Sequence, residues 1–144
     1  MSKINEEEVF NILTGKISSA INRALLRAFA LENIDITTEQ WSVLSCLWNK
    51  DKVTQQYLCD LTNKDKPSIT RLIDNLEKRH LVVRVSDISD RRINLIHLTE
   101  AGMTLKQKTS EIVQHIVDKS LNDISDDDLN TSKKVLNKIM KNLQ

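Results

Sequence analysis

The sequence predicts a mainly α-helical fold with a small β-hairpin, arranged as a winged helix-turn-helix between long N- and C-terminal helices. Three observations support this prediction. The chain has 144 residues but only two glycines and one proline, so few positions interrupt helices. Apolar residues recur at three- and four-residue steps through most of the chain, as on one face of a helix. Between residues 81 and 98 two short β-branched segments flank a polar turn, which is typical of a hairpin.

Composition sets limits on the class of protein. The apolar fraction is 40% and the charged fraction 28%, which excludes a disordered chain. Residues 53–99 hold eight Lys and Arg against six Asp and Glu, a mild basic excess that is compatible with a nucleic-acid partner. No run approaches the roughly 18 apolar residues of a membrane span. The first ten residues lack the long apolar core of a signal peptide, so we expect a cytoplasmic protein without a membrane segment.

Residues 6–31 are predicted to form one long helix, because apolar side chains recur on one face from Val9 to Phe29. At 1.5 Å per residue this helix is roughly 38 Å long. A domain of this size does not cover such a length, so we expect part of the apolar face to contact a partner.

A capping box predicts the start of the second helix, with Thr37 as N-cap and Gln40 at the third helical position. The inward face of this helix is expected to carry Trp41, Leu44, Leu47 and Trp48. Thr54 is expected to cap a short third helix, residues 54–61, with Leu58 and Leu61 pointing inward.

Asn63 lies in a tight connection to the fourth helix and tolerates a positive φ better than most residues. Asp65 is the predicted N-cap of that helix, and Pro67 fits its first turn. The apolar stripe of the helix comprises Ile69, Leu72, Ile73 and Leu76, and its opposite face carries Ser68, Thr70, Arg71 and Asn75.

Residues 81–85 and 93–98 are predicted to be the two strands of the hairpin, with Arg91 and Arg92 at its tip. Thr99 is expected to cap a helix over residues 100–120. Ser125 and Asp128 predict a second capping box at the start of the last helix.

The order short helix, tight turn, helix and hairpin over residues 54–98 defines a winged helix. The second helix of such a unit has the width of the major groove of B-DNA. Hydroxyl, amide and cationic side chains bind phosphates and base edges, and arginine at a hairpin tip is suited to the minor groove.

The segment from Thr54 to Gly102 resembles the MarR family of bacterial transcription regulators, most specifically in ITRLIDNLEKRHLVVR, then DRR, then LTEAG. The resemblance implies that Arg92 enters a minor groove and that Asp90 braces the wing through an ion pair. It also implies a homodimer that binds a pseudo-palindromic operator in double-stranded DNA. Residues 1–36 and 100–144 would form the helical dimerisation region, and residues 37–99 the DNA-binding domain. The expected DNA-binding residues are Lys64, Lys66, Pro67, Ser68, Thr70, Arg71, Asn75, Arg84, Asp90, Arg91 and Arg92.

Two positions depart from the family pattern. The family usually has glycine directly after the helix that reads DNA, and this chain has His80. We expect a left-handed conformation there, at a cost on the order of 1 kcal/mol relative to glycine. The first helix lacks the cysteine that peroxide-sensing relatives keep, which argues against sensing of organic peroxides.

The function predicted from the sequence is therefore a dimeric DNA-binding repressor, released by a small-molecule effector of unknown identity or by oxidation. Cys46 and Cys59 are expected to be buried small side chains, with a redox switch as the alternative. A winged-helix module for protein–protein contacts and a metal-sensing regulator also remain open, although the three histidines show no ligand spacing. No motif of an enzyme is found, and neither a cofactor nor a resident metal is expected.

Overall fold

The computed structural model describes residues 5–144. Residues 1–4 lie outside the described residues. They belong to the predicted dimerisation region and to the N-terminal segment in which no signal peptide was predicted. The helical arm consists of α1 (Glu6–Asn11), a π-helical turn η1 (Ile12–Lys16), α2 (Ile17–Leu31), α6 (Glu100–Ser120) and α7 (Asp126–Leu143). The winged unit consists of α3 (Thr38–Asn49), β1 (Val53–Thr54), α4 (Gln55–Thr62), α5 (Lys66–Lys78), β2 (Val82–Ser86) and β3 (Asn94–Leu98). The predicted mainly α-helical fold with a hairpin is confirmed.

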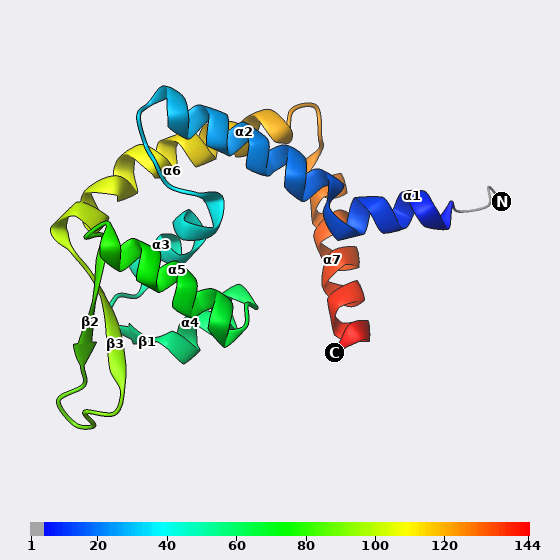
Figure 1. Ribbon diagram of the computed structural model, residues 1–144. Helices are drawn as coiled ribbons and strands as arrows, with labels where there is room; N and C mark the ends of the chain where they lie inside the picture. The colour runs from blue at the N-terminus through cyan, green and yellow to red at the C-terminus, as the bar shows by residue number, and fades with distance from the viewer. Residues whose placement is uncertain (1–4) are drawn as a thin grey trace.

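The arm extends away from the winged unit. α2 packs along α6, α1 projects from the end of this pair, and α7 runs from the same end across the direction of the pair (Figure 1). Neither α1 nor α7 contains a buried residue. No helix within residues 5–144 combines the length and the apolar character needed to cross a membrane.

The predicted helix over residues 6–31 begins and ends where expected, but it is not one continuous helix, because the chain bends near Gly15. There the backbone leaves helical values, with φ 165° and ψ −13°, and the hydrogen bonding widens to a π-helical turn. Glycine is among the poorest helix formers, since it loses the most backbone entropy on ordering. Apart from its chain neighbours and the backbone of its own helix, no atom lies within 4 Å of the place where a Gly15 Cβ would be, so a close approach of another segment does not require glycine there.

Local caps begin the helices where the sequence predicts. Thr37 and Gln40 form the reciprocal capping box, with both hydrogen bonds at 3.0 Å. Ser125 caps α7 by accepting from the Asp128 amide at 3.1 Å. The return bond that would complete a second box is not found within residues 5–144. An aspartate side chain is one methylene shorter than the glutamate or glutamine that makes this bond.

The short helix α4 is capped by Thr54 as predicted, but its inward face differs from the prediction. Leu58 is fully buried, whereas Leu61 is 54% exposed and Cys59 takes its place in the core. A face centred between residues 58 and 59 leaves residue 61 about a third of a turn away, at 100° per residue.

The sheet has three strands rather than two, in the antiparallel order β1-β3-β2. The hairpin pairs Val82 with Leu98 and Arg84 with Ile96, and β1 adds Val53 on the other side of Ile96. With two residues, β1 is too short to show an alternating pattern in the sequence.

His80 adopts the left-handed conformation expected for it, with φ 59°. Its amide donates to the Glu77 carbonyl at 2.9 Å, and the Leu81 amide donates to the Leu76 carbonyl at 3.0 Å. These two bonds form a Schellman motif, which ends α5 and turns the chain into β2.

The winged unit and the arm meet where α6 begins. Thr99 donates from its amide to the Leu81 carbonyl at 3.1 Å, and the Trp48 indole donates to the Gly102 carbonyl at 3.0 Å. A Cβ on Gly102 would lie 2.2 Å from the Leu81 carbonyl oxygen. Only glycine therefore allows α6 to approach the start of the hairpin this closely.

We predict that His80→Gly stabilises the protein by about 1 kcal/mol, because glycine adopts positive φ without the clash between Cβ and backbone. Urea unfolding at fixed protomer concentration measures the change. The matched control, His115→Gly within α6, should destabilise by a similar amount. A lower unfolding midpoint for His80→Gly than for the wild type would contradict the analysis.

Candidate nucleic-acid interface

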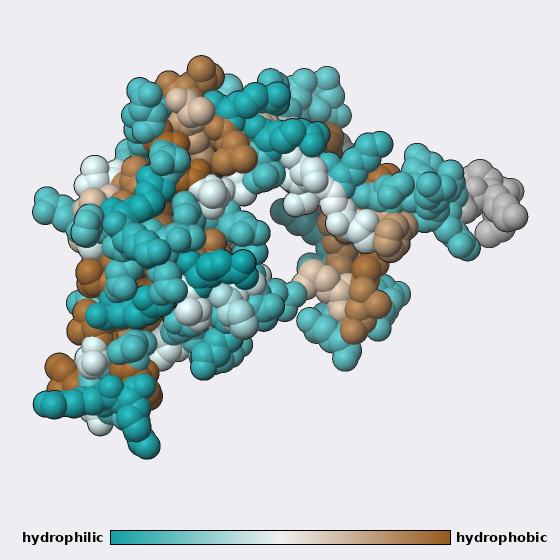
Figure 2. Space-filling model, viewed as in Figure 1, coloured by the Kyte–Doolittle hydropathy of each residue, from teal (hydrophilic) through white to brown (hydrophobic). Residues whose placement is uncertain are grey.

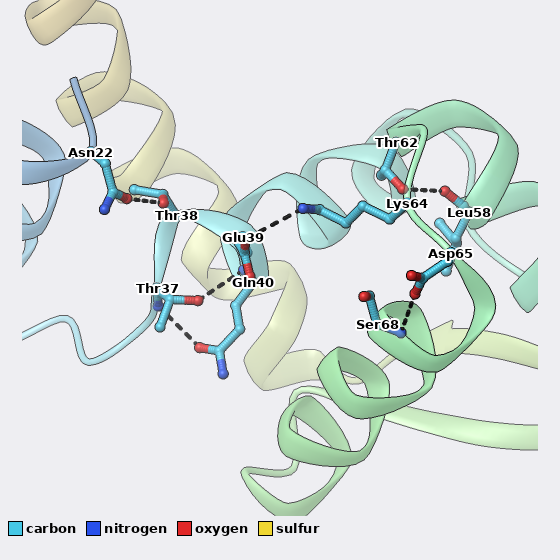
Figure 3. Close-up of polar contacts among 10 residues, drawn as sticks. All are labelled: Asn22, Thr37, Thr38, Glu39, Gln40, Leu58, Thr62, Lys64, Asp65 and Ser68. Atoms are coloured by element: carbon cyan, nitrogen blue, oxygen red, sulfur yellow. Dashed lines mark hydrogen bonds and ion pairs between the residues drawn. The ribbon is translucent and has the colours of Figure 1, made fainter. Parts of the chain in front are cut away.

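A left-handed turn and an N-cap fix the start of α5. Asn63 ends α4 with φ 54°, and the Asp65 carboxylate accepts from the Ser68 amide at 2.8 Å (Figure 3). Hydrogen bonds from the Ser68 side chain and amide, aided by the charges of Arg71 and Lys64, hold the pKa of Asp65 below its usual 3.8. The cap therefore stays ionised at neutral pH and is lost only as the pH falls through this lowered pKa.

The two faces of α5 differ sharply in burial. Its apolar stripe is buried in the core and comprises Ile69, Leu72, Ile73 and Leu76. On the other side, Lys66, Pro67, Arg71 and Asn75 are exposed, and Ser68 and Thr70 are half-buried. An open hollow of about 480 Å³ lies on this side, lined by Lys66, Pro67, Thr70, Arg71 and Asp74. Cations, a hydroxyl and a carboxylate thus share one outward surface.

Arg84 connects the wing to α5. Its guanidinium lies 2.7 Å from the Asp74 carboxylate and 3.1 Å from that of Glu77, and its amide donates to the other Glu77 oxygen at 3.0 Å. The Arg84 side chain is 22% exposed. We expected Arg84 to contact DNA, but the structure gives it two carboxylate partners within the chain, so its contacts are those of a brace between β2 and α5.

The wing tip carries the other two arginines that the sequence singles out. The Arg92 side chain is 91% exposed and lies 3.2 Å from the Asp90 carboxylate, which also accepts from the Arg92 amide. These two hydrogen bonds hold the pKa of Asp90 below its usual 3.8. Arg91 is exposed. The tip lies beyond the end of the hairpin and away from α5 (Figure 1), so α5 and the tip present two separate groups of cations.

Lys64 faces the arm rather than the outward side of α5. Its ammonium group lies 3.4 Å from the Glu39 carboxylate at the start of α3 (Figure 3). The neighbouring Thr38 hydroxyl donates to the Asn22 side chain of α2. The turn before α5 is thus linked through the first turn of α3 to the arm.

Sequence reasoning missed Gln55, the first residue of α4. Its side-chain amide donates to the Thr70 hydroxyl at 2.5 Å and joins α4 to the outward side of α5. Fifteen residues separate the pair, and no local pattern signals such a contact. The only indication in the sequence is the short connection between α4 and α5, which folds the two helices against each other and places the start of α4 beside the middle of α5.

An open cleft separates the arm from the winged unit. It has a volume of about 790 Å³, and its walls come from α2, the first turns of α3 and the turn before α5. Its lining combines apolar side chains of α2, namely Ile17, Ile21, Leu25 and Leu26, with the polar side chains of Asn22, Thr38, Glu39 and Lys64.

The cysteines lie apart from this cleft. Cys59 is buried and Cys46 is half-buried, and desolvation raises the pKa of the Cys46 thiol above 9.0. A raised pKa lowers the thiolate fraction and hence the reactivity. Within residues 5–144 no group of three His, Cys, Asp or Glu side chains is placed to hold a metal ion.

We predict that Arg84→Ala destabilises the protein by about 1 kcal/mol, because it removes the shared partner of Asp74 and Glu77, whose partly exposed carboxylates then bind water instead. Urea unfolding measures this, with Arg91→Ala as the matched control. Arg91 forms no ion pair in the part of the chain that the structure describes, and its removal should change stability by less than about 0.5 kcal/mol. Equal effects of the two variants would contradict the bracing role.

Comparison with known proteins agrees with this geometry. The sequence model of the MarR family matches residues 36–94. The chain is 29% identical over 113 residues to the organic hydroperoxide resistance transcriptional regulator of Bacillus subtilis, covering 78% of this chain and 76% of that one. A MarR-family transcriptional regulator from Rhodococcus sp. RHA1 has a similar structure, with a TM-score of 0.78, 25% identity and coverage of 95% and 97% of the two chains.

A second solved structure, CouR of Rhodococcus jostii RHA1 bound to p-coumaroyl-CoA, also has a TM-score of 0.78, at 26% identity over 96% of this chain and 95% of that one. The match over residues 36–94 spans α3, the helix-turn-helix and most of the wing, and the structural similarity extends over nearly the whole chain. Residues 36–94 thus match the MarR family, and nearly the whole chain has the fold of winged-helix transcription regulators of that family.

Proposed function

We propose that this protein is a sequence-specific regulator that binds a pseudo-palindromic operator in double-stranded DNA as a homodimer and represses transcription until an effector releases it. The observation that carries the proposal is the outward side of α5. Its cations, hydroxyl and amide lie opposite a buried apolar stripe, beside a wing whose tip exposes Arg92.

In the proposed complex α5 enters the major groove and the wing tip follows the adjacent minor groove. Lys66 and Ser68 are placed at the start of α5 for phosphate contacts, whereas Thr70, Arg71 and Asn75 are placed further along for base edges. The Asp90 carboxylate holds Arg92 at the tip. Because the tip carries a cation but no rigid helix, we propose that it senses groove width and negative potential rather than individual bases.

We predict that Arg92→Ala weakens binding to all operators by similar factors, about 1–3 kcal/mol per half-site, whereas Arg71→Ala removes a preference at particular base pairs. A binding selection over randomised half-sites measures both effects, and Thr70→Ala should resemble Arg71→Ala. If Arg92→Ala altered the base preferences of the half-site while Arg71→Ala left them intact, the assignment of α5 to the major groove and of the wing tip to the minor groove would be wrong.

The helical arm supports the proposal of a homodimer. Apolar side chains on α7 are half or more exposed in the single chain, including Val135, Leu136, Met140 and Leu143, and Figure 2 shows apolar surface along that helix. Phe10 of α1, Leu13 of η1 and Ile17 at the start of α2 are also exposed. We propose that residues 1–36 and 100–144 pair with those of a second copy, and that residues 37–99 are the DNA-binding domain.

We predict that Leu136→Glu converts the dimer to a monomer, since it places a charge among the apolar side chains of α7. Sedimentation equilibrium gives the mass directly. The control is Lys134→Glu, on the opposite face of α7, which makes a larger change in charge and should leave the dimer intact. A dimer of unchanged affinity in Leu136→Glu would remove α7 from the interface.

The cleft between the arm and the winged unit supports the proposal of a small-molecule effector. Its apolar and polar walls suit an amphiphilic ligand, and CouR, at 26% identity, was solved with p-coumaroyl-CoA. Lys64 belongs both to this cleft and to the turn before α5. A ligand that binds one arrangement of arm and winged unit better than the other would shift the spacing of the two α5 helices away from the roughly 34–36 Å between successive major grooves.

Oxidation is the second candidate signal, because the relative in Bacillus subtilis is named for organic hydroperoxide resistance. The surroundings of Cys46 and Cys59 favour the ligand instead. Gel shifts on the DNA upstream of the protein's own gene test these signals. Loss of the shift after oxidant would indicate oxidation sensing, and a change after chelator would indicate metal sensing. If the protein shifted no DNA at all, a winged-helix module for protein–protein contacts would be favoured. A regulator of this kind acts where the chromosome is, so we place it in the cytoplasm.

A further inference from the structure

The contact between Gln55 and Thr70 defines the direction of a hydrogen bond on the DNA-facing side of α5. Gln55 is the first residue of α4, and its Nε2 donates to Thr70 Oγ1 at 2.5 Å. Thr70 is half-buried and lines the outward hollow beside Lys66 and Arg71. The Gln55 side chain therefore reaches across the helix-turn-helix to a residue on the surface proposed to read DNA.

The chemistry of the two groups decides what Thr70 can offer. A hydroxyl has one proton to donate and two lone pairs to accept with, whereas the NH₂ of a side-chain amide only donates. Gln55 thus occupies a lone pair of Thr70. Among the described residues the Thr70 hydroxyl proton has no acceptor. This proton is therefore available for donation to a group in the hollow that Thr70 lines.

We propose that Gln55 is a specificity-determining residue that acts through Thr70, by fixing the Thr70 hydroxyl as a donor toward an acceptor in the major groove. This inference rests on the proposed function. The acceptors available there are purine N7, guanine O6 and thymine O4, whereas the exocyclic amines of cytosine and adenine are donors. At one base pair in each half-site, the protein should therefore prefer a base that presents a hydrogen-bond acceptor to the Thr70 hydroxyl.

Substitution of Gln55 by glutamate tests the direction of the bond. A carboxylate only accepts, so Gln55→Glu turns the Thr70 proton inward and leaves its oxygen facing the base. The preferred base at that position should then change from an acceptor to a donor. Thr70→Val should lose the preference, with a fall of about 3- to 10-fold in the ratio of best to worst base. Thr70→Ser should keep it.

The experiment is a binding selection over randomised half-sites with the full-length dimer, for the wild type, these three variants and the double variant Gln55→Glu with Thr70→Val. Gln56→Glu is the matched control, because it adds the same charge one residue away, where Gln56 bonds only to Asp60 of its own helix in the described contacts. It should lower affinity for all sequences alike. In the Thr70→Val background, Gln55→Glu should have no further effect on base preference.

Two results would overturn the inference, and they differ from failure of the proposed function. A Gln55→Glu profile identical to that of Gln56→Glu would show that Gln55 does not set the preference. A change that persists in the Thr70→Val background would show that Gln55 does not act through Thr70. If the wild type itself selected no sequence, the proposed function would fail and this inference with it. Thermal melts of each variant establish that the compared proteins are folded.

Discussion

Burial of one face of α5 is the constraint on which the rest of the structure depends. Four apolar side chains of α5 lie in the core, so the helix cannot rotate without exposing them to water. Its polar side is therefore held outward in one orientation. Three further contacts support this orientation: Asp65 fixes where the helix starts, His80 fixes where it ends, and Arg84 ties β2 to the C-terminal half of the helix.

The second constraint is the close approach of α6 to the hairpin. With Gly102 beneath the Leu81 carbonyl and the Trp48 indole bonded to the Gly102 carbonyl, the start of α6 is fixed to the winged unit. On the opposite side, α2 is joined to α3 through Asn22 and Thr38 across an open cleft. The arm is thus fixed to the winged unit where α6 begins, whereas α2 and α3 are separated by an open cleft. A ligand in the cleft would change the position of α2 relative to α3.

The sequence predicts well whatever depends on short-range interactions. The caps at Thr37, Thr54, Asp65 and Thr99, the left-handed Asn63 and the apolar stripe of α5 all follow from residues within four positions of one another. The left-handed conformation of His80 is expected from the family resemblance. Packing between distant segments decided the rest. The exposure of Leu61, the strand β1 and the contacts of Arg84 and Gln55 arise from neighbours that no local pattern reveals. The bend at Gly15 is local, but the apolar periodicity continues across it and masks it.

Chemical protection of operator DNA tests most directly whether α5 reads the major groove. Dimethyl sulfate methylates guanine N7 in the major groove and adenine N3 in the minor groove, so one footprint reports on both grooves. The structure predicts protection of guanine N7 in two patches about 10–10.5 base pairs apart, one for each α5 of the dimer. It also predicts protected adenine N3 where the wings carrying Arg92 lie. Protection confined to the minor groove, with guanine N7 fully reactive, would contradict the role given to α5.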